Sequence, residues 1–284
     1  MSTSTATRRT IRVGHSPDSD DAFMFYALTH DKLANGDLQF VHQLEDIETL
    51  NNRALQGELE VSAVSIHAFA HLADKYALLA SGCSMGDHYG PKLIAREPMT
   101  LDQAKGKTIA VPGKLTTAYL TLQLCLGKDV KVVLMPFDEI LPAVADGKVD
   151  VGLIIHEGQL FYQDKGLHQI VDLGQWWMGQ TGLPLPLGGN VVRKDLGEAT
   201  IAEIARLLRE SIEYALANRQ EALNYALNYA RDLDPKLADE FVGMYVNQWT
   251  VDYGPRGREA VRLLLDKASE AGLIPKKLDV EFVG

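Results

Sequence analysis

The sequence predicts an α/β protein built as two lobes. Over the first two-thirds of the chain, strand-like apolar runs alternate with helical patterns, which is typical of mainly parallel sheets covered on both faces. Residues 11–28 and 108–124 share one layout, in which a strand leads through a polar loop into a helix, and each heads a series of such units. The last third is helical. We therefore expect two related lobes rather than a single long sheet.

The two series divide the first two-thirds into strands and helices by the period of their apolar residues. In the first series the predicted strands are 10–14, 38–44, 61–64, 78–80 and 92–95, and the predicted helices are 21–29, 47–55 and 66–75. In the second series the predicted strands are 108–111, 131–135, 149–155 and 168–173, and the predicted helices are 116–126 and 138–146.

Helix-start signals mark the last third. Thr200 with Glu203 and Asn218 with Glu221 have the spacing of capping boxes, and Asp234–Pro235 is a strong helix start. Two apolar stripes at helical spacing accompany these signals: Ile201, Ile204, Leu208 and Ile212, then Val261, Leu264, Leu265 and Ala268, the second ending before Gly272.

The composition is that of a globular protein without a large basic surface. The 284 residues are 46% hydrophobic and 23% charged, and the formal net charge is −10. This balance argues against a broad nucleic-acid surface and gives no sign of attraction to anionic lipid. It leaves room for an anionic small molecule, because a few oriented amides bind an anion locally.

The cysteines and the N-terminus bear on the compartment. Cys83 and Cys125 form neither a CxxC motif nor a disulfide framework, and the helical run around Cys125 predicts a small core residue, so a reducing compartment fits. The first ten residues are polar and lack the apolar core of a secretory signal, and no run approaches membrane-spanning length. We expect a cytoplasmic protein.

The run VDVGLIIHE at residues 149–157 is the strongest candidate for chemistry. Val151, Leu153 and their neighbours predict a buried parallel strand that ends in His156 and Glu157. Ligands of open α/β sheets collect at the carboxyl ends of such strands, and a histidine there can move a proton near neutral pH. The run by itself is equally consistent with a histidine that only forms hydrogen bonds in a loop.

The start of the second series offers a candidate anion site. Gly113 leads to Thr116 and Thr117 at a predicted helix start, where free amides and hydroxyls suit a carboxylate or a phosphate. Ordinary helix capping is the alternative interpretation. Neither the GxxxxGK[ST] nor the GxGxxG pattern is present.

Three other groups of residues have a structural interpretation that we favour. Asp18, Asp20 and Asp21 have oxygen ligands suited to Mg²⁺, but acidic residues before an apolar helix more often cap it. His67 and His71 have the spacing of half a zinc site, yet no third ligand is evident, and we expect no metal. The remaining candidates are Trp176 and Trp177 in a loop-like stretch, which can stack on a flat ligand or cover the core, with the core favoured.

Ser65 and Asn51 complete the candidates. Ser65 ends the strand 61–64 in the position that His156 has relative to its own strand, and Asn51 follows the acidic segment EDIETL. Catalysis by Ser-His-Asp lacks support, because the sequence contains no GxSxG elbow.

Several long motifs together resemble one family. They are SPxxxDxFxFYAL at 16–28, LEDIETLN at 44–51, VPGKLTTAYLTLQL at 111–124, GLIIHE at 152–157 and DLGQWWMGQTGLPLPLG at 172–188. The resemblance is to the 1,4-dihydroxy-6-naphthoate synthases, which cleave cyclic dehypoxanthinylfutalosine in the futalosine route to menaquinone. It extends from about Arg12 to the late segment MYVNQWTVDYG, and motifs of this length and order are specific.

The resemblance implies a fold and a set of site residues. The fold is that of type II periplasmic binding proteins, which places 1–97 and 190–284 in one lobe and 98–189 in the other. The catalytic base would be His156, and no cofactor or metal would be needed. The substrate-binding residues would be Asn51, Ala63, Val64, Ser65, Thr116, Thr117, Ala118, Ile155 and Glu157.

This chain departs from the family pattern at two places. Family members often read SPCPNDTF where this chain reads SPDSDDAF, so that Asp18, Ser19, Asp20 and Ala22 differ. Others carry TKLS where this chain has SAVS, so that Ala63 stands in place of a lysine that would face the substrate. Both changes bear on how the substrate carboxylate is held, and we assign that task to the helix start at Thr116 and Thr117.

The resemblance implies a lyase that acts on a small-molecule carboxylate, with no nucleic-acid or membrane partner. The nearest rival hypothesis is chorismate dehydratase, the sister enzyme of the same pathway on the same fold, against which the histidine of LIIHE argues. Two more distant hypotheses are a solute-binding protein that feeds a transporter, and a binding-only regulator that has kept the fold and lost the activity.

Overall fold

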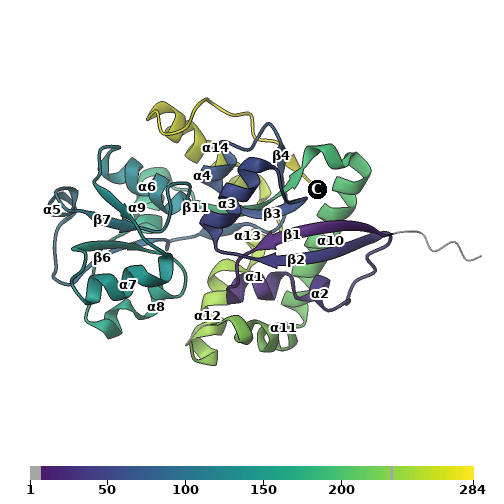
Figure 1. The fold of residues 1–284 in the computed structure, drawn as a ribbon, viewed down its shortest axis with the longest axis horizontal. Helices are drawn as coiled ribbons and strands as arrows, with labels where there is room; N and C mark the ends of the chain where they lie inside the picture. The colour runs from purple at the N-terminus through teal and green to yellow at the C-terminus, as the bar shows by residue number, and fades with distance from the viewer. Residues whose placement is uncertain (1–7, 231–232) are drawn as a thin grey trace, which may run out of the picture.

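The protein consists of two β-sheets, each with its own helices (Figure 1). The computed structural model describes residues 8–230 and 233–284. One sheet has seven strands in the order β12-β4-β11-β3-β1-β2, with β5 paired to β11, and the other has five in the order β10-β6-β9-β7-β8. In Figure 1 the five-stranded sheet and α5–α9 occupy the left half of the molecule.

The strands lie close to the predicted segments, apart from three that the sequence did not predict: β5, β11 and β12. In the seven-stranded sheet the strands are β1 Arg9–His15, β2 Leu38–Leu44, β3 Val61–Ser65, β4 Tyr76–Leu79, β5 Ser84–Gly86, β11 Leu185–Arg193 and β12 Phe282–Val283. In the five-stranded sheet they are β6 Lys92–Ala95, β7 Ile109–Val111, β8 Val132–Leu134, β9 Val151–Ile154 and β10 His168–Asp172.

Both sheets are mixed rather than mainly parallel. Within each series the strand–helix alternation produces parallel pairs, such as β1 with β3 and β7 with β9. The exceptions are the strands that carry the chain between the sheets: β6 is antiparallel to β9 and β10, and β11 is antiparallel to β3, β4 and β5. The alternation reports only the crossovers within a series, so it reveals neither the antiparallel direction of β6 nor the presence of β11.

The helices cover the sheets and close the C-terminal part. Those of the first two-thirds are α1 Ser19–Met24, α2 Tyr26–Thr29, α3 Ile47–Gln56, α4 Ile66–Phe69, α5 Leu101–Lys105, α6 Thr117–Leu126, α7 Phe137–Ala145, α8 Gly158–Phe161 and α9 Leu173–Thr181. The remaining ones are α10 Glu198–Ala217, α11 Arg219–Ala226, α12 Pro235–Tyr245, α13 Gln248–Val251 and α14 Gly254–Glu270. Both predicted apolar stripes are buried except Ile201: Ile204, Leu208 and Ile212 pack in one core cluster, and Val261, Leu264, Leu265 and Ala268 in another.

Several predicted helices differ from those observed. The helix predicted over 21–29 is two short helices, α1 and α2, which meet at Phe25. The helix predicted over 66–75 ends at Phe69, and the chain continues as turns in which amides bond three residues back. Most of residues 21–29 and of 66–70 are buried, and we attribute the interrupted helices to tertiary packing that overrides their helical periodicity.

The predicted helix starts are partly correct. Asp234 caps α12, with its carboxylate accepting hydrogen bonds from two backbone amides, and Pro235 is the first helical residue. Thr200 is not a cap, because α10 already begins at Glu198 after Gly197. Asn218 precedes α11 as predicted, but its side chain donates to the Tyr214 carbonyl of the previous helix instead of forming a capping box.

Two further predictions concern single residues. Trp176 and Trp177 lie in α9 and not in a loop, and Trp177 is fully buried in the core, as the favoured interpretation requires. Cys125 packs, partly buried, against the core of the five-stranded sheet.

Two strands belong to a different sheet from the one to which the expected division into lobes would assign them. β6 lies within the range 1–97 but belongs to the five-stranded sheet, and β11 begins within 98–189 but belongs to the seven-stranded sheet. The chain thus crosses between the sheets at residues 87–91 and returns at 182–184. We refer to the two parts as the seven-strand unit and the five-strand unit; the lobe boundaries at residues 97 and 190 stay a prediction.

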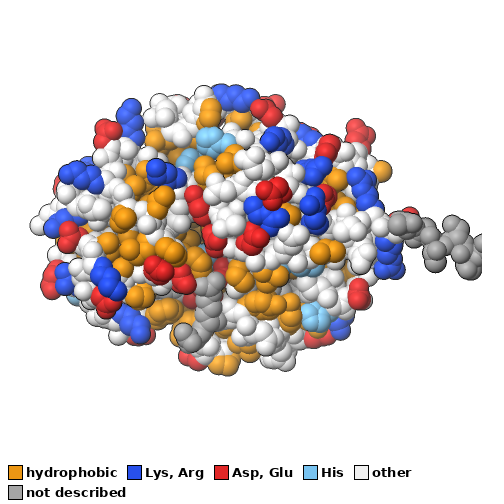
Figure 2. Space-filling model, in the orientation of Figure 1, with side chains coloured by type: hydrophobic (Ala, Val, Ile, Leu, Met, Phe, Trp, Pro, Cys, Tyr) orange, Lys and Arg blue, Asp and Glu red, His pale blue; other side chains and the backbone are white. Residues whose placement is uncertain are grey.

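The surface carries charges of both signs. On the face seen in Figure 2, basic and acidic side chains are interspersed and no broad basic area is present. Within residues 8–230 and 233–284, no helix is long and apolar enough to cross a bilayer. Residues 1–7, most of the polar segment that argued against a secretory signal, lie outside the described residues.

Candidate active site between the two sheets

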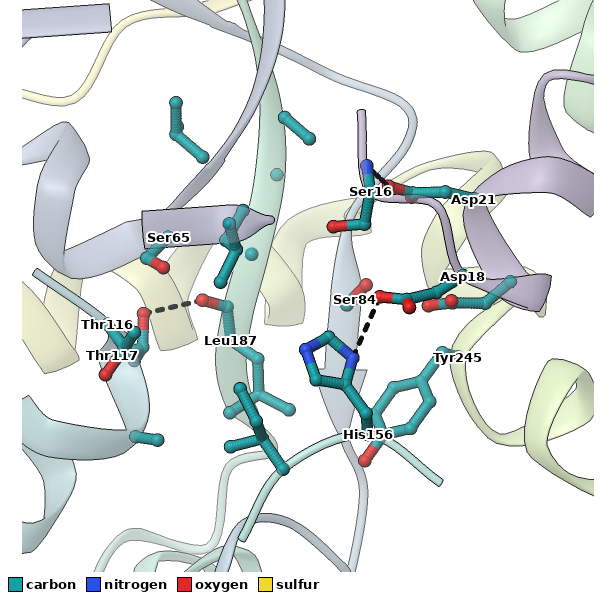
Figure 3. A pocket seen from close by; sticks show the side chains of 18 of the residues that line it. Ser16, Asp18, Asp21, Ser65, Ser84, Thr116, Thr117, His156, Leu187 and Tyr245 are labelled. Carbon is teal, nitrogen blue, oxygen red and sulfur yellow. Dashed lines mark hydrogen bonds and ion pairs between the residues drawn. The ribbon is translucent and has the colours of Figure 1, made fainter. Parts of the chain in front are cut away.

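A pocket lies between the two units and collects most of the predicted site residues (Figure 3). Its empty volume, including open solvent at the mouth, is about 790 Å³. Of the predicted residues, those that line it are Ala63, Val64, Ser65, Thr116, Thr117, Ala118, Ile155 and His156. They come from the ends of β3 and β9 and from the start of α6, where strand ends of both units face each other.

Asn51 and Glu157 do not line this pocket. Asn51 is buried behind Ser65: its carbonyl oxygen accepts the Ser65 amide at 2.9 Å, and its amide donates to the Ser65 hydroxyl oxygen at 3.1 Å. Because that hydroxyl oxygen already accepts a bond from Asn51, the hydroxyl proton is free to point elsewhere, and Ser65 lines the pocket. The Glu157 side chain is buried next to His156.

His156 occupies the point where β9 ends. Its φ of 59° lies in the left-handed region, which is uncommon for a residue with a side chain and recurs at functional sites. The Phe137 ring packs against the imidazole with 4.4 Å between ring centroids. Nδ1 of His156 lies 3.0 Å from Oδ2 of Asp18, and Figure 3 shows the other ring nitrogen on the opposite side, facing across the pocket toward Thr116 and Thr117.

The surroundings of His156 favour its protonated form. Burial by itself lowers the pKa of the imidazole, but the nearby carboxylates outweigh burial and raise that pKa to about 9. The largest of these effects come from the charge and the hydrogen bond of Asp18, followed by Glu157 and Asp20. At neutral pH and without ligand, His156 is therefore an imidazolium paired with Asp18.

The acidic group at residues 18–21 does not cap α1 as the favoured interpretation held. Asp18 precedes the helix but makes no side-chain capping bond, and its carboxylate turns instead to His156. Asp21 accepts the Ser16 amide at 2.7 Å, and burial raises its pKa to about 7. Burial, reinforced by the charges of Asp21 and Asp18, also raises the pKa of Asp20. Asp18, Asp20 and Asp21 all line the pocket.

The opposite end of the pocket is formed by the start of α6. Thr116 caps this helix, with its hydroxyl oxygen accepting the Tyr119 amide at 3.2 Å, and the Thr117 hydroxyl donates to the Leu187 carbonyl. Both hydroxyl groups thus already form hydrogen bonds within the protein. The first amides of a helix have no partner in the helix itself, so the backbone at Thr117 and Ala118 remains suited to an anion.

Glu48 of α3 reaches across to the loop before α6. Its carboxylate accepts the amides of Lys114 at 3.0 Å and Leu115 at 3.3 Å. It lies against Gly113, where a Cβ atom would be 2.4 Å from the Glu48 carboxylate. Two amides of this loop are therefore already bound by a carboxylate of the protein.

Sequence reasoning missed the pocket residues that come from distant segments. Ser16, Ser84, Gln159, Asn190 and Tyr245 line the pocket alongside the predicted residues. They lie in the β1–α1 turn, β5, α8, β11 and α12. Ser16 directly follows β1, so the signal that found Ser65 and His156 could have found it, whereas the other four do not stand at the end of a predicted parallel strand.

One group within the described residues has the spacing of metal ligands. Ligand atoms of Asp18, His156 and Glu157 lie within 4.8 Å of one another. The 3.0 Å separation of Asp18 and His156 is that of a charge-assisted hydrogen bond, so we treat the group as an ion pair with an adjacent carboxylate. His71 lies beyond the end of α4, which removes the helical register that suggested a half-site with His67.

The comparisons with a family model and with two relatives of known name agree with each other. The model of the family described as Menaquinone biosynthesis matches residues 11–270. The chain is 43% identical over 263 residues to 1,4-dihydroxy-6-naphtoate synthase of Thermus thermophilus, covering 93% of this chain and 95% of the relative. It is 38% identical over 274 residues to the protein of the same name from Streptomyces coelicolor, covering 94% and 95%.

Solved structures confirm the predicted fold class. A protein of Archaeoglobus fulgidus is 48% identical and superposes with a TM-score of 0.90, covering 93% of this chain and 98% of that chain. The alkanesulfonate-binding protein of Xanthomonas axonopodis pv. citri, solved with MOPS bound, is 14% identical with a TM-score of 0.68 and 95% of each chain covered. The second likeness shows the fold alone, which is the two-lobed fold of periplasmic binding proteins.

Proposed function

The chain belongs to the menaquinone biosynthesis family, and from this premise we propose that it converts cyclic dehypoxanthinylfutalosine to 1,4-dihydroxy-6-naphthoate and dihydroxyacetone. The observation that carries the proposal is the imidazole of His156, which lies in the pocket between the two units with one ring nitrogen facing the open space. A histidine so placed can take a proton from a bound molecule.

In the proposed reaction, His156 removes a proton from the substrate and so opens the ring derived from ribose. The bond to the three-carbon fragment then breaks in a step like a retro-aldol reaction, and dihydroxyacetone leaves. The remaining carbocycle becomes aromatic, which supplies the thermodynamic driving force. This carbon–carbon lyase chemistry uses no redox cofactor.

Different polar groups of the pocket would bind different parts of the substrate. The helix start at Thr117 and Ala118 offers free amides and a favourable dipole for the substrate carboxylate, while the acidic end would repel it. Hydroxyl groups of the substrate can bond instead to Asp20 and Ser16 at the acidic end. This orientation places the part of the substrate derived from sugar next to His156.

The raised pKa of His156 predicts the pH dependence of the reaction. A base must be unprotonated, and its pKa of about 9 means that only a small fraction is neutral at pH 7. We therefore expect kcat/KM to rise about tenfold between pH 7 and pH 8, more slowly near pH 9, and to level off above about pH 10.

The proposal is tested by changing His156. His156→Asn should reduce turnover by at least about 100-fold while the product still binds, because the general base is lost and the pocket is kept. Turnover is measured by the appearance of the dihydroxynaphthoate, and product binding by calorimetry. The matched control is His168→Asn at an exposed position of β10, which should behave like the wild type.

Near-normal turnover of His156→Asn would refute the role of this residue. The same assay separates the rival hypotheses: dehydration of chorismate would identify the sister activity, and tight binding without turnover would indicate a solute-binding protein or a regulator. The cytoplasmic location stays a prediction that cell fractionation can check.

A further inference from the structure

The carboxylate that bonds to His156 comes from the other unit of the protein. Asp18 lies in the turn between β1 and α1 of the seven-strand unit, whereas His156 follows β9 of the five-strand unit. Their side chains are 2% and 17% exposed, and Oδ2 lies 3.0 Å from Nδ1. The two residues therefore meet only where the two units face each other across the pocket (Figure 3).

We attribute the orientation of the His156 ring to its contact with Asp18, because neither the backbone nor the packing of the ring fixes it. The residue has left-handed backbone geometry and is followed by a turn, so no regular element fixes its side chain. Phe137 covers the ring from within the five-strand unit, and its phenyl group offers no hydrogen-bonding atom to either nitrogen. The directional partner of the imidazole is the Asp18 carboxylate.

A hydrogen bond at Nδ1 decides which nitrogen can act as a base. When Nδ1–H donates to a carboxylate, the neutral imidazole carries its lone pair on Nε2. Nε2 is the atom that faces the pocket in Figure 3. A partner of this kind also increases the basicity of the ring.

We propose that Asp18 is the positioning residue of His156: it accepts the Nδ1 proton so that Nε2 faces the substrate, and the approach of the two units assembles the pair. This inference rests on the proposed role of His156 as a base. It adds that the base is correctly oriented only in the closed protein, when the β1–α1 turn meets the end of β9.

The charges around the pair support this assignment. The titratable groups that interact with His156 are Asp18, Asp20, Asp21 and Glu157. Among the influences that raise the pKa of the imidazole against burial, those of Asp18 are the largest. Removing the Asp18 charge should therefore lower the pKa of His156 while the other carboxylates remain.

The direct test is Asp18→Asn, which keeps an oxygen acceptor and removes the charge. We expect kcat to fall about 10- to 100-fold with KM changed less than about threefold, as for other residues that orient a catalytic group. The acid limb of the kcat/KM profile should move to lower pH. The matched control, Asp102→Asn, removes a carboxylate that is 92% exposed on α5, and it should leave the rate and the profile unchanged.

A second measurement does not depend on a variant. In the wild-type protein, ¹⁵N NMR of histidine labelled at both ring nitrogens reports the tautomer of His156, with the signals assigned by comparison with His156→Asn. We expect the proton to stay on Nδ1 when the ring becomes neutral at high pH. A neutral ring with its proton on Nε2 would overturn the inference.

The outcomes distinguish this inference from the proposed function. If His156→Asn is inactive and Asp18→Asn retains kcat within about twofold and an unchanged pH profile, the base stands and the role of Asp18 is refuted. A lower rate of Asp18→Asn with an unmoved acid limb would indicate a merely structural role and would also refute it. If His156→Asn is active, the proposed function itself fails.

Discussion

Asp21 illustrates how burial changes the behaviour of one carboxyl group. It lies in the first turn of α1 beside Asp20, just after Asp18, and its carboxylate accepts the Ser16 amide. Burial is the largest influence and raises its pKa to about 7, although the Ser16 hydrogen bond and the charge of His156 act in the opposite direction. At neutral pH this group is close to the midpoint of its titration.

This shift predicts how stability depends on pH. Between about pH 4 and pH 7 the folded protein keeps a proton on Asp21 that the unfolded chain has released, so the contribution of this group to stability falls as pH rises through that range. Asp21→Asn cannot titrate and keeps an oxygen acceptor for Ser16. We expect its melting temperature to increase relative to the wild type by several degrees from pH 4 to pH 7, with little further change above pH 8.

Calorimetry at four pH values between 4 and 8.5 measures this difference. Asp102→Asn, at an exposed position of α5, controls for the loss of a carboxylate and should show no comparable trend. A constant difference between Asp21→Asn and the wild type over the whole range would show that burial does not shift this group.

At the scale of elements, the side chain of Glu48 links α3 of the seven-strand unit to the loop before α6 of the five-strand unit. Glu48 is in the first turn of α3, which packs on β1 and β3, and it accepts two amides of the loop that follows β7. A carboxylate in this position replaces water at amides that precede a helix, where negative charge is favoured. We interpret the contact as a latch that holds the two units together.

Removal of the latch should weaken substrate binding more than catalysis. For Glu48→Ala we expect KM to rise about tenfold, which corresponds to the loss of hydrogen bonds to a charged group, while kcat changes less than about threefold. Hydrogen exchange of the Lys114 and Leu115 amides should become faster. Glu58→Ala, which removes an exposed carboxylate paired with Arg53 just after α3, serves as the control.

An unchanged KM of Glu48→Ala together with unchanged exchange at these amides would contradict the latch. A loss of kcat with KM unchanged would place Glu48 in the chemistry instead.

At the scale of the whole molecule, two crossings join the units, and the outgoing one packs backbone to backbone against the start of α9. The outgoing crossing includes Tyr89 and Gly90, and Gly174 lies in the first turn of α9. A Cβ atom at Gly174 would lie 1.9 Å from the Tyr89 carbonyl oxygen, and one at Gly90 would lie 2.7 Å from the Gly174 nitrogen. Only glycine allows this approach.

Gly174→Ala should therefore disturb both stability and the site. The methyl group meets backbone atoms that cannot move aside as a side chain would, so we expect a loss of about 1–3 kcal/mol in the free energy of unfolding. Activity should also fall, because the outgoing crossing helps to set the position of one unit relative to the other. Chemical denaturation and the turnover assay measure the two effects.

Gly106→Ala is the control for this prediction. Its backbone is right-handed helical, and the nearest atom to a new Cβ would be the Gln103 carbonyl oxygen at 3.7 Å. Equal stability of Gly174→Ala and Gly106→Ala would mean that the crossings tolerate displacement.

The sequence by itself determined most of the elements and part of the candidate site. Apolar periodicity located most strands and helices, and the end of one buried run located His156 in the correct position at the end of β9. Long motifs also identified the fold class, which the solved structures confirm. These features are local, because each strand, helix and strand end depends on the pattern of consecutive residues.

Only the tertiary structure decided which side chains meet. Asp18, which the sequence predicted to cap a helix, pairs instead with His156. Asn51 lies behind Ser65 rather than in the pocket, and β11 joins the seven-stranded sheet as an antiparallel strand. The physical reason is that such contacts depend on how the faces of distant segments pack, and the local period of a sequence does not encode that packing.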